Sequence, residues 1–134
     1  MTNVYEEFGK HAGEIWRTLD KYGPLTELKL KETTKLKDDE FYVAIGWLAR
    51  ENKIWKDGPF YKLGSTNLTY KIGNDAGNVW KLLETKGTID IYDVSTTLKL
   101  DERDIYAALG WLARENKIEA KTPTVPREYR PRFQ

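Results

Sequence analysis

The chain of 134 residues contains no cysteine and only one histidine, His11. Without cysteine it has no disulfide, no thiolate metal site and no cysteine nucleophile, and a single histidine leaves little from which to build a histidine-based site. A glycine-rich phosphate loop is also missing, because no glycine is followed by Lys-Ser or Lys-Thr. We therefore expect no metal, no cofactor, no small-molecule substrate and no enzymatic activity.

Long apolar runs are missing as well. None approaches the roughly 18 apolar residues of a membrane span. The first residues lead into Glu6 and Glu7 rather than into the basic and then apolar stretch of an export signal. These absences predict a cytoplasmic protein that does not contact the membrane.

A strong charge of one sign is the last absence. The sequence has 22 Lys and Arg against 21 Asp and Glu, for a net charge of +1, which argues against avid, non-specific binding of nucleic acid. The distribution is uneven: residues 1–64 carry 11 of each sign, 65–120 carry 7 basic and 9 acidic residues, and 121–134 carry 4 basic and 1 acidic. Basic charge is in excess only near the C-terminal end.

The chain does contain a long internal repeat. Gly-Trp-Leu-Ala-Arg-Glu-Asn-Lys-Ile occurs at 46–54 and again at 110–118, an offset of 64 residues that also pairs Trp16 with Trp80 and Gly23 with Gly87. Two units of about 60 residues are near the lower limit for an independent core, so we expect each to depend on the other. The predicted domains are 1–64 and 65–121, followed by a tail at 122–134 that is rich in Pro, Arg and aromatic residues.

Each copy is predicted to form three helices and a hairpin. Apolar residues at helical spacing over 12–19 and 76–83 indicate a first helix that ends at Gly23 or Gly87. Second helices are expected at 26–34 and 90–98, and third helices begin with acidic residues, with Asp101 as an N-cap. Strands flank Asp57-Gly58-Pro59 in the first copy. The second hairpin should be weaker because Pro126 interrupts its outer arm.

This layout resembles a winged helix-turn-helix. More closely, Ala-Gly-x-(Ile/Val)-Trp followed by Ala-x-Gly-Trp-Leu-Ala-Arg-Glu-x-Lys-Ile resembles a small prokaryotic winged-helix family of unknown function whose members usually have one copy. The resemblance implies a mainly α fold with small β-hairpin wings, in two tandem domains. By analogy it implies DNA binding, but it supplies no site residues.

The third helices lack the chemistry of ordinary groove reading. Their outward positions are apolar and aromatic, whereas base edges and phosphates require hydrogen-bonding and cationic side chains. One interpretation is structural, with Trp16 packed over Gly46, Trp80 over Gly110, and the following tryptophans in the core. The other is an interface with a protein partner or between the copies. The candidate interface residues are Tyr42, Trp47, Arg50, Tyr106, Trp111 and Arg114.

Basic side chains elsewhere offer a candidate surface for duplex DNA. Those on the second helix, the following turn and the wing of the first copy are Lys29, Lys31, Lys35, Lys37, Lys53, Lys56 and Lys62, and those of the tail are Arg127, Arg130 and Arg132. The alternatives are an ordinary solvated surface, and a tail whose Tyr129 and Phe133 pack on the second copy. The sequence thus favours a non-enzymatic, transcription- or chromatin-associated DNA-binding protein, with a protein-interaction adaptor as the alternative.

Overall fold

The computed structural model describes residues 3–122 and 127–132. The first copy consists of α1 (Val4–Tyr22), β1 (Leu25–Thr26), α2 (Glu27–Thr34), α3 (Asp38–Arg50), β2 (Ile54–Asp57) and β3 (Phe60–Leu63). The second consists of the π-helical turn η1 (Thr69–Gly73), α4 (Asn74–Lys86), α5 (Ile91–Leu98), α6 (Glu102–Arg114), β4 (Ile118–Ala120) and β5 (Tyr129–Pro131). The three predicted helices of each copy are present.

The first helix of each copy ends at the predicted glycine. Gly23 has φ 77° and Gly87 has φ 82°, and their N–H groups donate to the carbonyl oxygens of Leu19 at 2.9 Å and Leu83 at 2.7 Å. Positive φ values carry little steric cost for glycine. The chain therefore turns back at the same point in both copies.

The boundaries of the second and third helices also repeat. Lys35 and Lys99 end the second helices with φ 64° and 59°, and Asn52 and Asn116 follow the third helices with φ 61° and 60°. Asp101 is the predicted N-cap of α6, and its side chain accepts a hydrogen bond from the backbone N–H three residues later at 3.1 Å. Equal local sequence has produced equal backbone.

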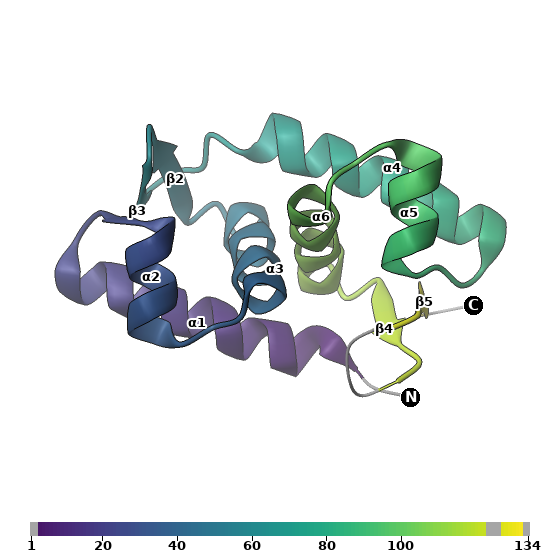
Figure 1. Cartoon of the computed structure of the whole chain (residues 1–134), viewed down its shortest axis with the longest axis horizontal. Helices are drawn as coiled ribbons and strands as arrows, with labels where there is room; N and C mark the ends of the chain where they lie inside the picture. Colours follow the sequence, from purple (N-terminus) through teal and green to yellow (C-terminus); the bar gives the residue numbers. More distant parts are fainter. Residues whose placement is uncertain (1–2, 123–126, 133–134) are drawn as a thin grey trace.

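The two copies are arranged around a central pair of helices, α3 and α6 (Figure 1). On opposite sides of this pair lie α1 and α4, α2 and α5, and the two hairpins. The N-terminal part of α1 reaches the second copy near β4, and η1 contacts α3. The copies thus share one hydrophobic core rather than forming two separate ones.

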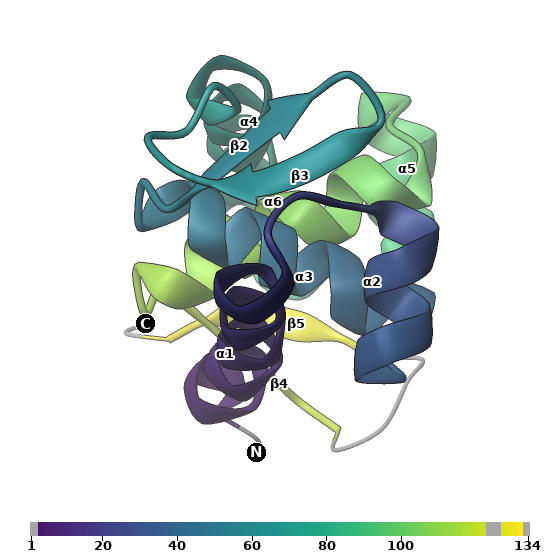
Figure 2. The ribbon, with the colours of Figure 1, turned by 90° about the vertical axis from the view of Figure 1, so that its left-hand side faces the viewer.

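The first wing is a three-stranded antiparallel sheet in the order β1, β3, β2. In Figure 2 the hairpin of β2 and β3 lies at the top of the view, with α1 below it. Trp55 pairs with Lys62, and Phe60 pairs with both Asp57 and Thr26. Because paired residues project to the same side of a sheet, these five side chains form one face, which we call the outer face of the first wing. The opposite face carries buried Ile54 and Tyr61.

The second wing takes its outer strand from the predicted tail. Tyr129 pairs with Ala120, and Pro131 with Ile118, while a further bridge joins Tyr129 to Ile89. Tyr129 is buried, so the strand formed by this segment packs on the second copy. Residues 123–126 and Phe133 lie outside the described residues.

The closest approach in the core is between the backbones of α3 and α6. A Cβ on Gly46 would overlap the carbonyl oxygen of Ala107 and lie 2.9 Å from its Cα, and a Cβ on Gly110 would meet Val43 in the same way. The prediction that Trp16 packs over Gly46 is wrong, because the backbone of α6 occupies that position. Trp16 is instead 37% exposed.

Replacing Gly46 with alanine is expected to destabilise the protein strongly, because the added Cβ meets backbone that cannot rotate away. Overpacking of this kind costs about 1–3 kcal/mol or more. The measurement is the free energy of unfolding from urea denaturation.

Gly77 provides the matched control, since it lies within α4 and a Cβ there would have nothing within 4 Å. Gly77→Ala should stabilise the helix by about 0.5–1 kcal/mol. Equal stability of the two alanine variants would contradict the close helix contact.

Candidate nucleic-acid interface

The third-helix surfaces that would enter a DNA groove are packed against each other. Val43 and Ala107 hold outward positions of this surface, yet both are buried, and each backbone faces the glycine of the other copy. In this arrangement a duplex cannot reach either surface. The positions that a winged helix commonly uses for base reading serve here to join the copies.

The candidate interface arginines form a reciprocal set of ion pairs between the copies. Nε of Arg50 donates to Glu115 at 3.1 Å, and Nε of Arg114 donates to Glu51 at 3.0 Å. Each glutamate directly follows an arginine in the repeated sequence, so the same two positions of the repeat form both ion pairs. The pairs lie at the rim of the helix contact and are partly exposed.

The candidate interface tryptophans close the contact from both sides. Trp47 is 6% exposed and Trp111 is partly buried. Ring atoms of Trp47 lie 3.0 Å from where a Cβ of Gly9 would be, and those of Trp111 lie 3.2 Å from the corresponding point on Gly73. Each indole also has the guanidinium of the other copy's arginine over its ring, at 5.7 Å from the centroid.

Tyr42 belongs to a polar cluster that ties α2 to α3. Its hydroxyl donates to Glu27 at 2.6 Å, and the amine of Lys31 lies 2.8 Å from Glu27 and 2.9 Å from Asp38. Burial lowers the pKa of Lys31, but its bonds to these carboxylates outweigh burial and raise it. For Glu27 the effects have the opposite signs. Burial acts to raise the pKa of its carboxyl, but the bonds from Lys31 and Tyr42 outweigh burial and lower it. Lys31 is therefore a poor candidate for a phosphate contact, because its charge is used inside the fold.

Tyr106, the counterpart of Tyr42, is buried, and among the described residues no such cluster surrounds its hydroxyl. Burial raises the pKa of its hydroxyl, and the carboxylates of Asp39 and Glu102 add to the effect. The two tyrosines occupy equivalent positions but have different surroundings.

The remaining first-copy lysines differ in how they are engaged. Within the described residues, Lys29, Lys35 and Lys37 are exposed and form no ion pair. Lys53 lies 3.6 Å from Glu51 and Lys62 lies 3.9 Å from Asp57, both weak surface contacts.

Lys56 is more constrained. Its amine donates to the carbonyl oxygen of Gly58 at 2.6 Å and lies over the ring of Tyr61, 5.0 Å from the centroid. It helps to hold the turn of the first wing and is a poor phosphate contact.

The tail arginines belong to the fold rather than to a free basic segment. Arg127 is 7% exposed and donates to Glu7 of α1 at 2.9 Å, and Arg130 lies 3.5 Å from Glu119 across the second wing. Arg127 is therefore a poor candidate for a DNA contact, because it is buried against the first copy.

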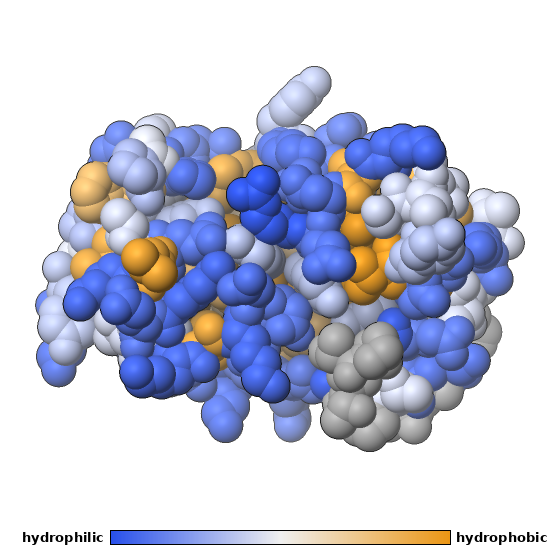
Figure 3. Space-filling model, viewed as in Figure 1, coloured by the Kyte–Doolittle hydropathy of each residue, from blue (hydrophilic) through white to orange (hydrophobic). Residues whose placement is uncertain are grey.

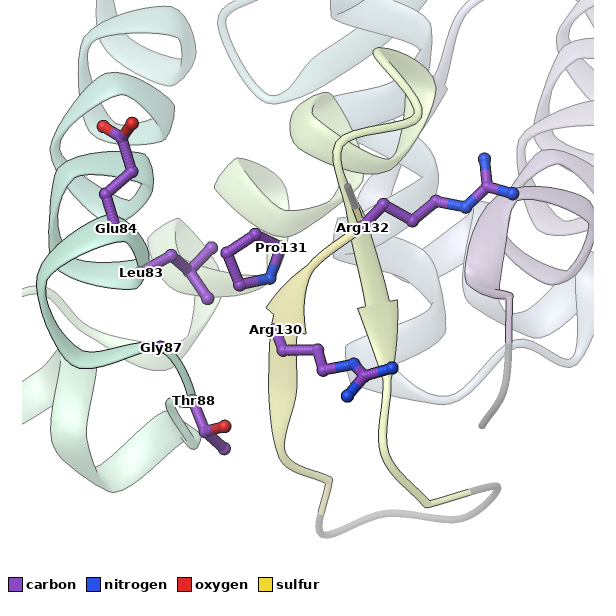
Figure 4. A pocket seen from close by; sticks show the side chains of 7 residues that line it. All are labelled: Leu83, Glu84, Gly87, Thr88, Arg130, Pro131 and Arg132. Carbon is purple, nitrogen blue, oxygen red and sulfur yellow. The ribbon is translucent and has the colours of Figure 1, made fainter. Parts of the chain in front are cut away.

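A pocket of about 320 Å³ lies beside the second wing. Figure 4 shows the guanidinium groups of Arg130 and Arg132 directed away from Leu83 and Thr88, which line its opposite wall. The two cations therefore do not converge on a single point in the pocket at which an anion could bind. On the side seen in Figure 3, apolar residues form separate small patches among polar ones.

Within residues 3–122 and 127–132, no helix is long and apolar enough to cross a membrane, and no cluster of His, Asp and Glu has the composition of a metal site.

A family model described as a winged helix-turn-helix domain (DUF2582) matches residues 1–58 and again residues 68–125. The chain belongs to this winged helix-turn-helix family. No curated protein and no solved structure matches it. The family match confirms the predicted class, a mainly α protein with small wings and two tandem winged-helix domains. Domains of this class commonly bind DNA.

Sequence reasoning missed the partners of the arginines and tryptophans. Glu51, Glu115, Gly9 and Gly73 were available as signals, because each glutamate recurs after a repeated arginine and the two glycines are related by the offset of 64. The repeat shows which residues share a role, but it does not show what they contact.

Reversing the charge of Arg50 to glutamate is expected to lower the free energy of unfolding by roughly 1 kcal/mol, since two carboxylates would then face each other at a partly exposed site. The double variant Arg50→Glu with Glu115→Arg should recover most of the loss. A double-mutant cycle in urea denaturation measures the coupling, and strictly additive effects would contradict the ion pair.

Proposed function

We propose that this protein is a non-enzymatic DNA-binding protein that contacts phosphates through exposed lysines of the first copy, without inserting a third helix into the groove. The observation that carries the proposal is the difference in charge between two copies of the same fold. Where the first copy has exposed Lys29 and Lys37, the second has half-buried Asp93 and exposed Asp101.

The contact surface consists of one side of α2, the turn that follows it, and the first wing. Its cations are the exposed side chains of Lys29, Lys35, Lys37 and Lys53 and the half-buried side chain of Lys62. Glu27 and Asp38 lie in the same region but are already paired with Lys31. Their negative charge is thus partly neutralised, which favours the approach of a phosphate backbone.

Phosphate contacts of this kind give affinity without sequence information. With a net charge of +1 on the whole chain, we expect moderate binding that weakens steeply with salt. The chain would serve as a DNA-associated factor whose position on the duplex is not set by base reading.

The alternative, an adaptor that uses the tryptophan surfaces, is less well supported. Those surfaces are occupied by each other within the chain, so a protein partner would have to separate α3 from α6. Separation would expose a large apolar area and leave Arg50 and Arg114 without their glutamates.

Lys35→Glu is expected to weaken binding of a labelled random-sequence duplex and to reduce the slope of log K against log salt by about 0.9. The measurement is fluorescence anisotropy at several salt concentrations. A Lys29→Glu and Lys35→Glu double variant should roughly double the change in slope.

Lys99→Glu is the matched control. Lys99 holds the same left-handed position at the end of α5 that Lys35 holds at the end of α2, so both substitutions should have the same effect on stability. Only the first-copy variant should weaken binding. Equal loss in both variants, or no binding by the wild-type protein at low salt, would contradict the proposal.

A further inference from the structure

The outer face of the first wing carries two exposed aromatic rings. Trp55 is 38% exposed and Phe60 is 43% exposed, and they project from the same side of neighbouring antiparallel strands. Trp55 pairs with Lys62, and Phe60 is two residues from Lys62 along β3, so the two rings are diagonal neighbours. Such neighbours are about 7–8 Å apart, within reach of large side chains.

The same face also carries a cation. The amine of Lys62 lies 5.8 Å from the centroid of the Trp55 ring and 3.9 Å from Asp57. Both contacts are long and partly exposed, so they are easily exchanged for a phosphate. Lys29 is linked to this face through Thr26. Its backbone N–H donates to the Thr26 hydroxyl at 3.2 Å, in the first turn of α2, and Thr26 pairs with Phe60.

We propose that the outer face of the first wing binds unpaired bases of single-stranded nucleic acid, with one base stacked on Trp55, the next on Phe60, and the intervening phosphate on Lys62. This site rests on the proposed function, nucleic-acid binding by the first copy, and makes single strands the preferred ligand. Exposed rings on a sheet with cations beside them suit single strands, because every base offers a ring face whereas bases in a duplex are already stacked.

The second copy does not repeat this face. Glu119 stands at the position of Trp55, and in the second wing it pairs with Arg130, 3.5 Å from its guanidinium. A carboxylate held in an ion pair provides neither a stacking surface nor a phosphate contact. We therefore expect one single-strand site in each chain.

The mixed chemistry also argues for nucleic acid over a protein partner. A protein hot spot buries its aromatic rings in a desolvated pocket, whereas these rings stand on an open, solvated sheet next to Lys62 and Asp57. A strand that stacks its bases while its phosphates remain in water fits such a surface.

The test is fluorescence anisotropy of the full-length protein with a labelled oligothymidylate of about ten nucleotides, compared with an oligouridylate and with a duplex of the same length. Trp55→Ala and Phe60→Ala should each weaken binding of the single strands by about 5- to 150-fold, the range for loss of one stacked base. Trp55→Phe should recover most of the affinity. Tighter binding of one oligomer identifies DNA or RNA as the preferred source of the strand.

Tyr70→Ala is the matched control, since Tyr70 is the most exposed aromatic residue among those described and lies outside the wing. It should leave binding unchanged. Midpoints of urea unfolding are measured for every variant, so that loss of fold is separated from loss of contact.

The outcomes separate the two proposals. If Trp55→Ala and Phe60→Ala bind as the wild type does while Lys35→Glu binds more weakly, the stacking site is overturned and phosphate binding stands. If the wild-type protein prefers the duplex, the single-strand site is again overturned. If neither single strands nor duplex bind at low salt, both proposals fail.

Discussion

The contact between the backbones of α3 and α6 is the constraint on which the rest of the structure depends. It requires Gly46 and Gly110, because any side chain there would overlap the facing helix. Glycine within a helix costs about 1 kcal/mol relative to alanine, and the close packing that it permits offsets this cost. Two copies that are each too small for a secure core thereby share one.

That contact also limits where a ligand can bind. Once the third helices are buried on each other, a partner must bind groups outside this contact, such as those on α2, α5 and the two wings. The glycines at the centre of the contact are the same in both copies, whereas surface positions such as Lys29 and its counterpart Asp93 differ. One copy can then acquire a binding surface without disturbing the fold that both share.

The sequence predicted most of the elements because their signals are local. Helix periodicity, the glycines that end α1 and α4, and the Asp101 cap depend on residues within a few positions of one another. The partner of Gly46 could not be predicted in this way. A helical glycine indicates that something approaches closely, but choosing between Trp16 and another backbone requires the tertiary arrangement.

The same limit explains why the partners of the candidate cations were not predicted. Counting charges identified Lys31 and Arg127 as available, but Arg127 pairs with Glu7, which is 120 residues away in the chain. The structure of the tail was predicted only in part. The charge of the tail suggested a free basic segment, whereas its aromatic residues suggested packing on the second copy. Tyr129 is buried, so packing determines where the described part of the tail lies. Long-range ion pairs leave no periodic trace in a sequence.

A chain with a net charge of +1 cannot depend on Coulomb attraction alone to hold nucleic acid. Phosphate contacts lose much of their strength as salt rises, because releasing counterions into a more concentrated solution gains less entropy. Stacking on Trp55 and Phe60 involves no net charge and is affected much less. If both kinds of contact operate, the affinity for single strands falls with salt to a plateau that is set by the two rings, whereas the affinity for duplex continues to fall.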